Sequence, residues 1–114
     1  MTTGGGSTLS THVLDAVSGE PAAGVRVVLS RRDGDAWTEV STASTDADGR
    51  VRELADGLDA GDHRLVFDTG AWFAATGTTG FYPEVAVVFT VSQERHLHVP
   101  LLLSPYAYST YRGS

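Results

Sequence analysis

Short runs in which apolar and polar residues alternate are the feature that most restricts how this chain can fold. They are separated by stretches rich in glycine, proline and aspartate, which favour turns. Two β-rich runs, residues 25–32 and 36–44, flank an Asp-Gly-Asp turn and predict a hairpin. Strands of this length with such turns are typical of two antiparallel sheets packed face to face. The pattern therefore predicts an all-β sandwich.

The remaining runs extend the same prediction over the rest of the chain. The other predicted strands are the run that begins at Leu9 and residues 50–54, 63–69, 85–91 and 94–103. One apolar stretch, Ala-Trp-Phe-Ala-Ala, does not alternate and is followed by Gly77. It predicts one short helix near residues 71–76.

The length of the chain, 114 residues, fits a single domain with a modest core, which oligomerisation would help to stabilise. Residues 1–8 are rich in glycine and threonine and are expected to form a flexible lead-in, followed by one domain over residues 9–114. The N-terminus lacks the basic and apolar regions of a secretory signal. We therefore expect a cytoplasmic protein.

Charge and composition exclude several classes of function. The net charge of −6 argues against a nucleic-acid-binding protein, because phosphate contacts require a basic surface. There is no cysteine, which excludes disulfides, thiolate metal ligands and cysteine nucleophiles. No stretch approaches the roughly 18 apolar residues of a membrane-spanning helix, so no membrane partner is expected.

Two histidines, His96 and His98, are two positions apart on a predicted strand and therefore share one face. The opposite face is apolar and should lie in the core; it comprises Leu97, Val99, Leu101 and Leu103. The residues alone favour two histidines on an exposed face. A zinc site is a weaker alternative, because it needs a third ligand from His12 or His63 and no metal-binding motif supports one.

Three other polar residues have simple structural interpretations. His12 lies mid-strand on the face opposite Leu9 and Val13, where a partly buried, hydrogen-bonded histidine is expected. Arg50 ends a loop and is expected to be solvated, and His63 is expected at the surface. Periodicity and composition alone thus predict a β-sandwich without an obvious site.

Four segments of the chain resemble the transthyretin-like 5-hydroxyisourate hydrolases. They are residues 10–29, 65–77, 81–89 and 96–114, so the likeness covers nearly the whole chain. The terminal Tyr-Arg-Gly-Ser is the most specific of these motifs, because hormone-carrying transthyretin shares the fold but lacks this ending. The Asp, Gly, Pro and Gly-Val turn pattern near the N-terminus is shared with many sandwich domains.

The resemblance implies a reaction on the route from urate to allantoin. These enzymes hydrolyse 5-hydroxyisourate at a ring amide and give 2-oxo-4-hydroxy-4-carboxy-5-ureidoimidazoline, without a metal or an organic cofactor. Mapped onto this sequence, the family's catalytic residues are His12, Arg50, His98 and Ser114. Its substrate-binding residues are Tyr111, Arg112 and Gly113.

General chemistry explains why such a set would open an amide ring. Histidine exchanges protons near neutral pH, and arginine presents a planar fork of donors to oxo groups and to a developing oxyanion. The C-terminal tail would then form a folded wall of the active site. Which histidine takes the proton, and whether His96 takes part, stays open.

The resemblance further implies a homotetramer, a dimer of dimers with active sites in the channel where two dimers meet. Two alternatives come from other classes of function. One is a transthyretin-like protein that binds a small molecule without catalysis, and the other is a structural sandwich module. The carrier would need neither the catalytic histidines nor a terminus that carries arginine, and a structural module would normally lie among other domains.

Overall fold

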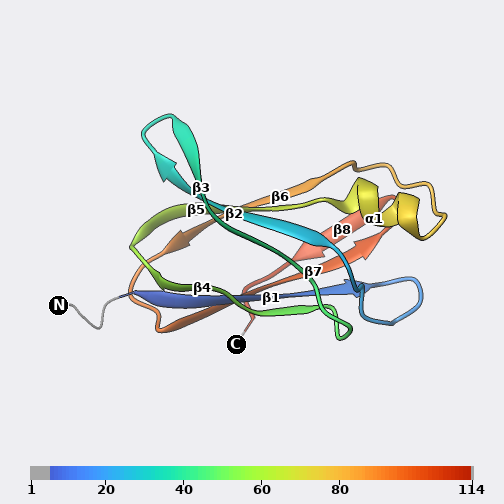
Figure 1. Cartoon of the computed structure of the whole chain (residues 1–114), viewed down its shortest axis with the longest axis horizontal. Helices are drawn as coiled ribbons and strands as arrows, with labels where there is room; N and C mark the ends of the chain where they lie inside the picture. The colour runs from blue at the N-terminus through green and yellow to red at the C-terminus, as the bar shows by residue number, and fades with distance from the viewer. Residues whose placement is uncertain (1–5, 114) are drawn as a thin grey trace.

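The computed structural model describes residues 6–113, which form two packed four-stranded sheets (Figure 1). The lower sheet in that view has the order β4-β1-β7-β8, and the upper sheet has the order β3-β2-β5-β6. The strands are β1 (Ser7–Asp15), β2 (Arg26–Asp33), β3 (Ala36–Ser44), β4 (Arg50–Leu58), β5 (Gly61–Phe67), β6 (Val85–Val91), β7 (His96–Ser104) and β8 (Ala107–Thr110). The predicted all-β sandwich with one short helix is confirmed.

Most neighbouring strands are antiparallel, as predicted, but β1 and β7 pair in parallel over eight positions. The predicted antiparallel sandwich therefore contains one parallel pair among the described strands. The two strands are far apart in the sequence, so no hairpin turn fixes their relative direction. This parallel pair lies at the centre of the lower sheet and places side chains from both ends of the chain next to one another.

Helix α1 (Thr69–Ala75) connects β5 to β6 and is the predicted helix, although it begins two residues earlier than expected. Asp68 is the reason, because its side chain accepts a hydrogen bond from the Ala71 backbone N–H at 3.2 Å and so acts as the N-cap. The Phe73 ring packs into the core, and Trp72 Nε1 donates to the Ala23 carbonyl at 2.9 Å. These contacts dock the helix at the end of the sandwich remote from the start of β1 (Figure 1).

The space between the sheets is filled by the apolar side chains that alternate along each strand. Leu97, Val99, Leu101 and Leu103 of β7 are buried, which confirms the predicted core face of this strand. From β1, Leu9 and Val13 join them, while Ser10 and His12 point to the opposite side of the sheet. The apolar alternation therefore fixes which residues of β1 and β7 reach the outer face.

His63 is buried, contrary to the expectation of a surface residue. Its ring stacks on Phe89 at 6.0 Å between centroids, and its Nδ1 lies 3.2 Å from the Gly61 carbonyl oxygen. The period of two along β5 explains the position, because His63 shares a face with the core residues Leu65 and Phe67.

Strand β1 begins at Ser7, so Ser7 and Thr8 belong to the sheet rather than to the expected lead-in; residues 1–5 lie outside the described part of the chain. Thr8 is already paired with His96 in the parallel ladder. Within residues 6–113, no helix is long and apolar enough to cross a membrane.

Candidate active site

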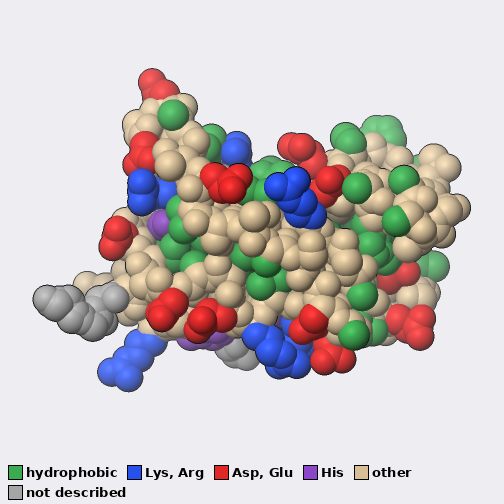
Figure 2. All heavy atoms as spheres, viewed as in Figure 1, with side chains coloured by type: hydrophobic (Ala, Val, Ile, Leu, Met, Phe, Trp, Pro, Cys, Tyr) green, Lys and Arg blue, Asp and Glu red, His purple; other side chains and the backbone are tan. Residues whose placement is uncertain are grey.

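The outer face of the lower sheet brings together three of the residues singled out in the sequence. His12 of β1 lies directly opposite Arg50 of β4 in the antiparallel ladder, and Ser10 of β1 lies beside His98 of β7 in the parallel ladder. Because side chains two positions apart share a face, Ser10, His12, His96 and His98 all project to the same side. Figure 2 shows histidine and arginine side chains together along this lower side of the molecule.

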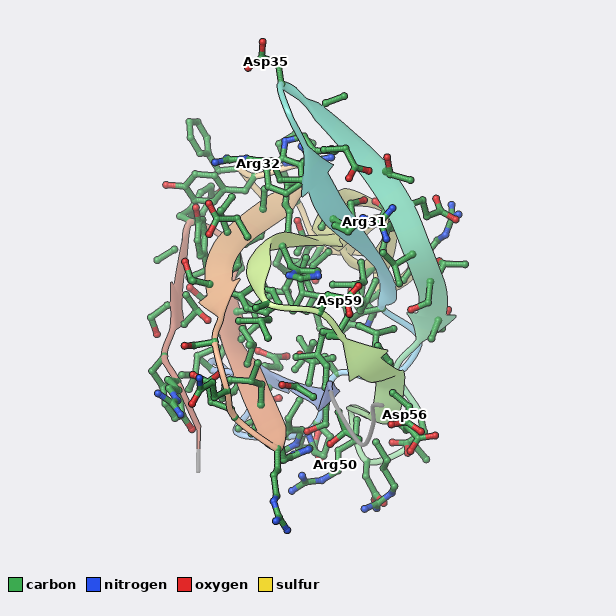
Figure 3. The ribbon with its side chains drawn as sticks, turned by 90° about the vertical axis from the view of Figure 1, so that its left-hand side faces the viewer. Arg31, Arg32, Asp35, Arg50, Asp56 and Asp59 are labelled. Carbon is green, nitrogen blue, oxygen red and sulfur yellow. The ribbon has the colours of Figure 1, made fainter. Side chains whose placement is uncertain are left out.

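A cavity of 230 Å³ opens on this face between β1, β4 and β7. It is lined by Ser10, Thr11, Arg50, Arg52, His96 and His98. Figure 3 shows Arg50 below the strands, outside the space between the two layers, while Arg31 and Arg32 lie in the upper part of that view on the β2–β3 hairpin. The cavity is thus a polar, cationic hollow on the sheet surface and is separate from the apolar core.

The loop before β4 holds Arg50 in place through its backbone. Asp46 Oδ1 accepts hydrogen bonds from the backbone N–H groups of Asp48 and Arg50, at 2.8 and 3.0 Å. Gly49, with a φ of +73°, packs so closely that a Cβ there would lie 2.5 Å from the Val13 carbonyl oxygen. The loop therefore needs glycine at this position, and this tight loop places Arg50 opposite His12.

The two arginines of the cavity differ in their partners. Arg52 forms ion pairs with Asp48 at 3.3 Å and with Asp46 at 3.9 Å. Arg50 forms no ion pair with any other residue between positions 6 and 113. Its guanidinium is therefore the one available to bind an anion or an oxyanion.

A chain of hydrogen bonds connects the two histidines of β7 through β1. Ser10 Oγ lies 2.7 Å from His98 Nδ1 and 3.1 Å from His96 Nε2, and Thr8 Oγ1 lies 2.6 Å from His96 Nδ1. Within the described residues, the buried Nε2 of His12 has no hydrogen-bond partner. His98 is thus held through one ring nitrogen, which leaves its other nitrogen for chemistry.

Burial and positive charge lower the pKa values of both candidate catalytic histidines. Desolvation lowers the pKa of His12 below its ordinary value, and the nearby Arg50 guanidinium lowers it further. Desolvation also lowers the pKa of His98, followed by Arg50, His12 and His96, whereas a hydrogen bond to the Ser10 backbone opposes these effects. Both histidines are therefore neutral, and able to accept a proton, at neutral pH.

The tail is ordered against β7 and contains a strand that the sequence analysis did not predict. Strand β8 pairs with β7 from Leu101 to Ser104, and the chain then returns to β7 at Gly113, whose backbone N–H donates to the His98 carbonyl at 2.8 Å. Gly113 also packs on the imidazole, because a Cβ there would lie 2.6 Å from His98 Cδ2. Glycine at this position thus lets the tail cover His98.

The other predicted tail residues lie elsewhere. The exposed side chains of Tyr111 and Arg112 line a second, mainly apolar cavity of 340 Å³ between β6 and β7, and Arg112 lies 3.8 Å from Glu94. The single chain therefore does not place these two side chains beside His12, Arg50 and His98. Ser114, the fourth predicted catalytic residue, lies outside the described residues.

The described part of the chain contains no cluster of ligands that would support the zinc alternative. No group of three or more His, Cys, Asp or Glu side chains between residues 6 and 113 is arranged to hold a metal ion. His63, one of the two possible third ligands, is buried in the core by β5.

The sequence analysis missed Thr8 and Ser10 as members of the site. Their spacing from His12 is a signal that was available, because Thr8, Ser10 and His12 must share one face of a strand. Their contact with His96 and His98 was not visible, since it depends on the parallel pairing of β1 with β7.

Comparisons with known proteins identify the family of this chain. Residues 9–113 match the family model described as the HIUase/Transthyretin family. A 5-hydroxyisourate hydrolase of Caulobacter vibrioides is 50% identical over 114 residues, which cover 95% of this chain and 99% of the relative.

Solved structures of two related proteins share the fold. The structure of Klebsiella pneumoniae 5-hydroxyisourate hydrolase is 42% identical, with a TM-score of 0.87, and the match covers 95% of this chain and 99% of that one. Sea bream transthyretin in complex with thyroxine is 38% identical, with a TM-score of 0.88, and covers 92% and 93%. The sandwich fold, the matched family model and these full-length relatives together show that the chain belongs to the HIUase/Transthyretin family.

Proposed function

We propose that this protein is a hydrolase that converts 5-hydroxyisourate to 2-oxo-4-hydroxy-4-carboxy-5-ureidoimidazoline in urate degradation. The observation that carries the proposal is a polar cavity on the outer face of the lower sheet that Arg50 and His98 line, with His12 directly opposite Arg50 in the strand ladder. The 5-hydroxyisourate hydrolases among the relatives support the same reaction.

The reaction needs a base, an oxyanion partner and an acid, and the cavity offers all three. A neutral histidine takes a proton from water while the water oxygen attacks the ring amide carbonyl. Negative charge then develops on the carbonyl oxygen, where the Arg50 guanidinium donates hydrogen bonds. The C–N bond breaks, and the imidazolium returns its proton to the departing nitrogen. Hydrolysis thus adds one water without requiring a cofactor.

The tail completes the site in this proposal. Gly113 covers the His98 ring, and Ser114, the next residue in the sequence, is proposed as a further catalytic residue. Tyr111 and Arg112 are assigned to substrate binding. The 3.8 Å ion pair of Arg112 with Glu94 joins an exposed guanidinium to a half-buried carboxylate, and such pairs hold a side chain weakly. Arg112 can therefore turn towards a bound anion at little cost.

The pH dependence of the reaction should reveal the lowered histidine pKa values. Activity needs a neutral base, and the pKa values of His12 and His98 lie below the ordinary 6.5, so the neutral forms persist as the pH falls through that value. We expect kcat/KM to be flat near neutral pH and to decline only below pH 6.5. Initial rates from pH 5 to 8 measure this; a decline centred above pH 6.5 would contradict the assignment.

The Gly113→Ala variant should lose activity through displacement of His98. The added methyl group would lie 2.6 Å from His98 Cδ2 and 3.2 Å from His98 Cγ, so either the ring or the tail must move. A misplacement near 1 Å can cost about 100-fold in rate, and we expect kcat/KM to fall by roughly 10- to 100-fold. Gly77→Ala is the control, since Gly77 has a φ of +73° but open space around it. It should lower the melting temperature and leave the rate unchanged.

A direct assay separates an enzyme from a carrier. Freshly generated 5-hydroxyisourate should disappear faster, by ultraviolet absorbance, when the protein is present at a hundredth of its concentration. A carrier that only binds the compound would need stoichiometric amounts to affect its decay and would leave the initial rate unchanged at that ratio. The relative solved with thyroxine is an example of a family member that binds a small molecule. A carrier, however, does not require His96 and His98 next to Arg50, which forms no ion pair within residues 6–113.

We also propose a quaternary structure on the basis of the family resemblance. A homotetramer, built as a dimer of dimers, is supported by the edge strands β6 and β8, which end their sheets and carry the exposed side chains Val88 and Tyr108. Exposed Phe81 and Tyr106 add apolar surface at the α1 end. Light scattering should give four chains per particle. A single domain over residues 9–114 and a cytoplasmic location remain part of the proposal.

A further inference from the structure

His98 is at one end of a continuous chain of hydrogen bonds that begins at Thr8 and runs along the outer face of the lower sheet. The order of groups is the Arg95 carbonyl, the Thr8 hydroxyl, the His96 ring, the Ser10 hydroxyl and the His98 ring. The successive distances are 3.3, 2.6, 3.1 and 2.7 Å. Nothing in the reaction outlined above requires Thr8, Ser10 or His96.

Counting donors and acceptors gives this chain one direction when both histidines are neutral. The Thr8 hydroxyl has a single proton and donates it to the Arg95 carbonyl, so towards His96 it can only accept. His96 Nδ1 must therefore carry a proton, and its Nε2 must then accept one from the Ser10 hydroxyl. Ser10 in turn has no proton left for His98 and accepts from His98 Nδ1–H.

This direction fixes the tautomer of His98. A neutral imidazole with its proton on Nδ1 has a lone pair on Nε2, which is the atom that must accept a proton from water. The closeness of Gly113 to the ring leaves little room for it to turn.

We propose that Thr8, His96 and Ser10 form a positioning relay that holds His98 in the Nδ1–H tautomer and so makes its Nε2 the general base. The inference rests on the proposed function for its catalytic consequence. The same relay gives His96 a specific effect on the reaction. A proton added to His96 makes Nε2 a donor, turns the Ser10 hydroxyl towards His98 Nδ1, and moves the His98 proton to Nε2, where it blocks the base.

The charged and titratable groups around His98 come from three strands. They are His12 of β1, Arg50 and Arg52 of β4 and His96 of β7, whereas the Arg112 side chain of the tail lines the other cavity. Only His96 is joined to His98 through a hydroxyl that can reverse. If the acid limb of the pH–rate profile changes when the Ser10 hydroxyl is removed, the change therefore reports the relay and not the general charge of the cavity.

The first test is the tautomer itself, read from ¹⁵N chemical shifts of the imidazole nitrogens in the full-length protein at pH 8. We expect His98 to carry its proton on Nδ1. A proton on Nε2 would overturn the proposal. This measurement needs neither substrate nor a variant, so it tests the relay even if the protein does not hydrolyse 5-hydroxyisourate, in which case only the proposed function fails.

The second test compares rates among hydroxyl variants. Ser10→Ala should lower kcat by about 10- to 100-fold with little change in KM, because a general base contributes about 100- to 10,000-fold and the variant keeps the ring but not its orientation. Its His98 proton should move towards Nε2. Ser10→Thr, which retains the hydroxyl, should restore most of the rate, and Thr8→Val should give a smaller fall.

The matched control is Ser41→Ala in β3, which also removes a partly buried serine hydroxyl, donated at 2.5 Å to the Leu54 carbonyl, but lies outside the relay. It should leave kcat unchanged. Ser10→Ala with an unchanged kcat, or with a lower kcat and no change in the His98 tautomer, would refute the relay.

Discussion

The His98→Asn variant is expected to lose 5-hydroxyisourate hydrolysis by about 100- to 10,000-fold in kcat/KM, the usual contribution of a general base. The amide can still donate to Ser10 but offers no basic nitrogen to the cavity. His98 is half-buried on the outer face, and the apolar residues of β7 that form the core lie on the other side of the strand. The fold should therefore persist, with a melting temperature close to that of the unmodified chain.

Stopped-flow absorbance and circular dichroism on the same preparation make this test decisive. Loss of the general base should lower the rate by at least about 100-fold. A folded His98→Asn protein whose rate stays within about threefold of the original would therefore show that His98 is not the base. His12 would then become the candidate, because its Nε2 is buried beside Arg50.

The second large effect is expected for Arg50→Gln. Removing one donor to a developing oxyanion costs about 100- to 1,000-fold in kcat. The same change removes a positive charge that lowers the pKa values of His12 and His98, so the acid limb of the pH–rate profile should move up towards pH 6.5. Loss of rate and an upward shift of the limb should therefore occur together.

Arg52→Gln is the comparison that identifies the arginine. Arg52 lines the same cavity, but its guanidinium is held by Asp48 and Asp46 in an exposed network. We expect its replacement to cost less than tenfold in rate, because the two aspartates already engage its guanidinium. A larger loss for Arg52→Gln than for Arg50→Gln would assign the oxyanion contact to Arg52 instead.

Alternation along the sequence was sufficient to predict most strands and the core face of β7, because burial of one face imposes a period of two. Strand β8 was not predicted from this alternation. Its four residues are all exposed and it is held by backbone pairing with β7, so no apolar face marks it. The burial of His63 was mispredicted for a different reason. A polar residue at the start of a strand was assigned to the surface, although its spacing from Leu65 and Phe67 placed it on the core face.

The candidate site was only partly visible in the sequence. The motifs indicated His12, Arg50 and His98 through family resemblance, and strand periodicity fixes which face of its own strand each histidine occupies. Their convergence depends on two pairings between distant segments: β1 with β7 in parallel, and β1 with β4 through the register that sets His12 against Arg50. No local pattern encodes such pairings. The role of Ser10 between two histidines depends on them as well.

The central claim is that the histidines of this outer face catalyse ring opening, and one measurement tests it most directly. The decay of freshly generated 5-hydroxyisourate is followed at substoichiometric protein, in parallel for the full chain and for a His12→Gln/His98→Gln double variant whose fold and particle size are verified. The account predicts many turnovers per chain for the former and decay at the protein-free rate for the latter. Equal acceleration by both proteins, or none by the full chain, would contradict it.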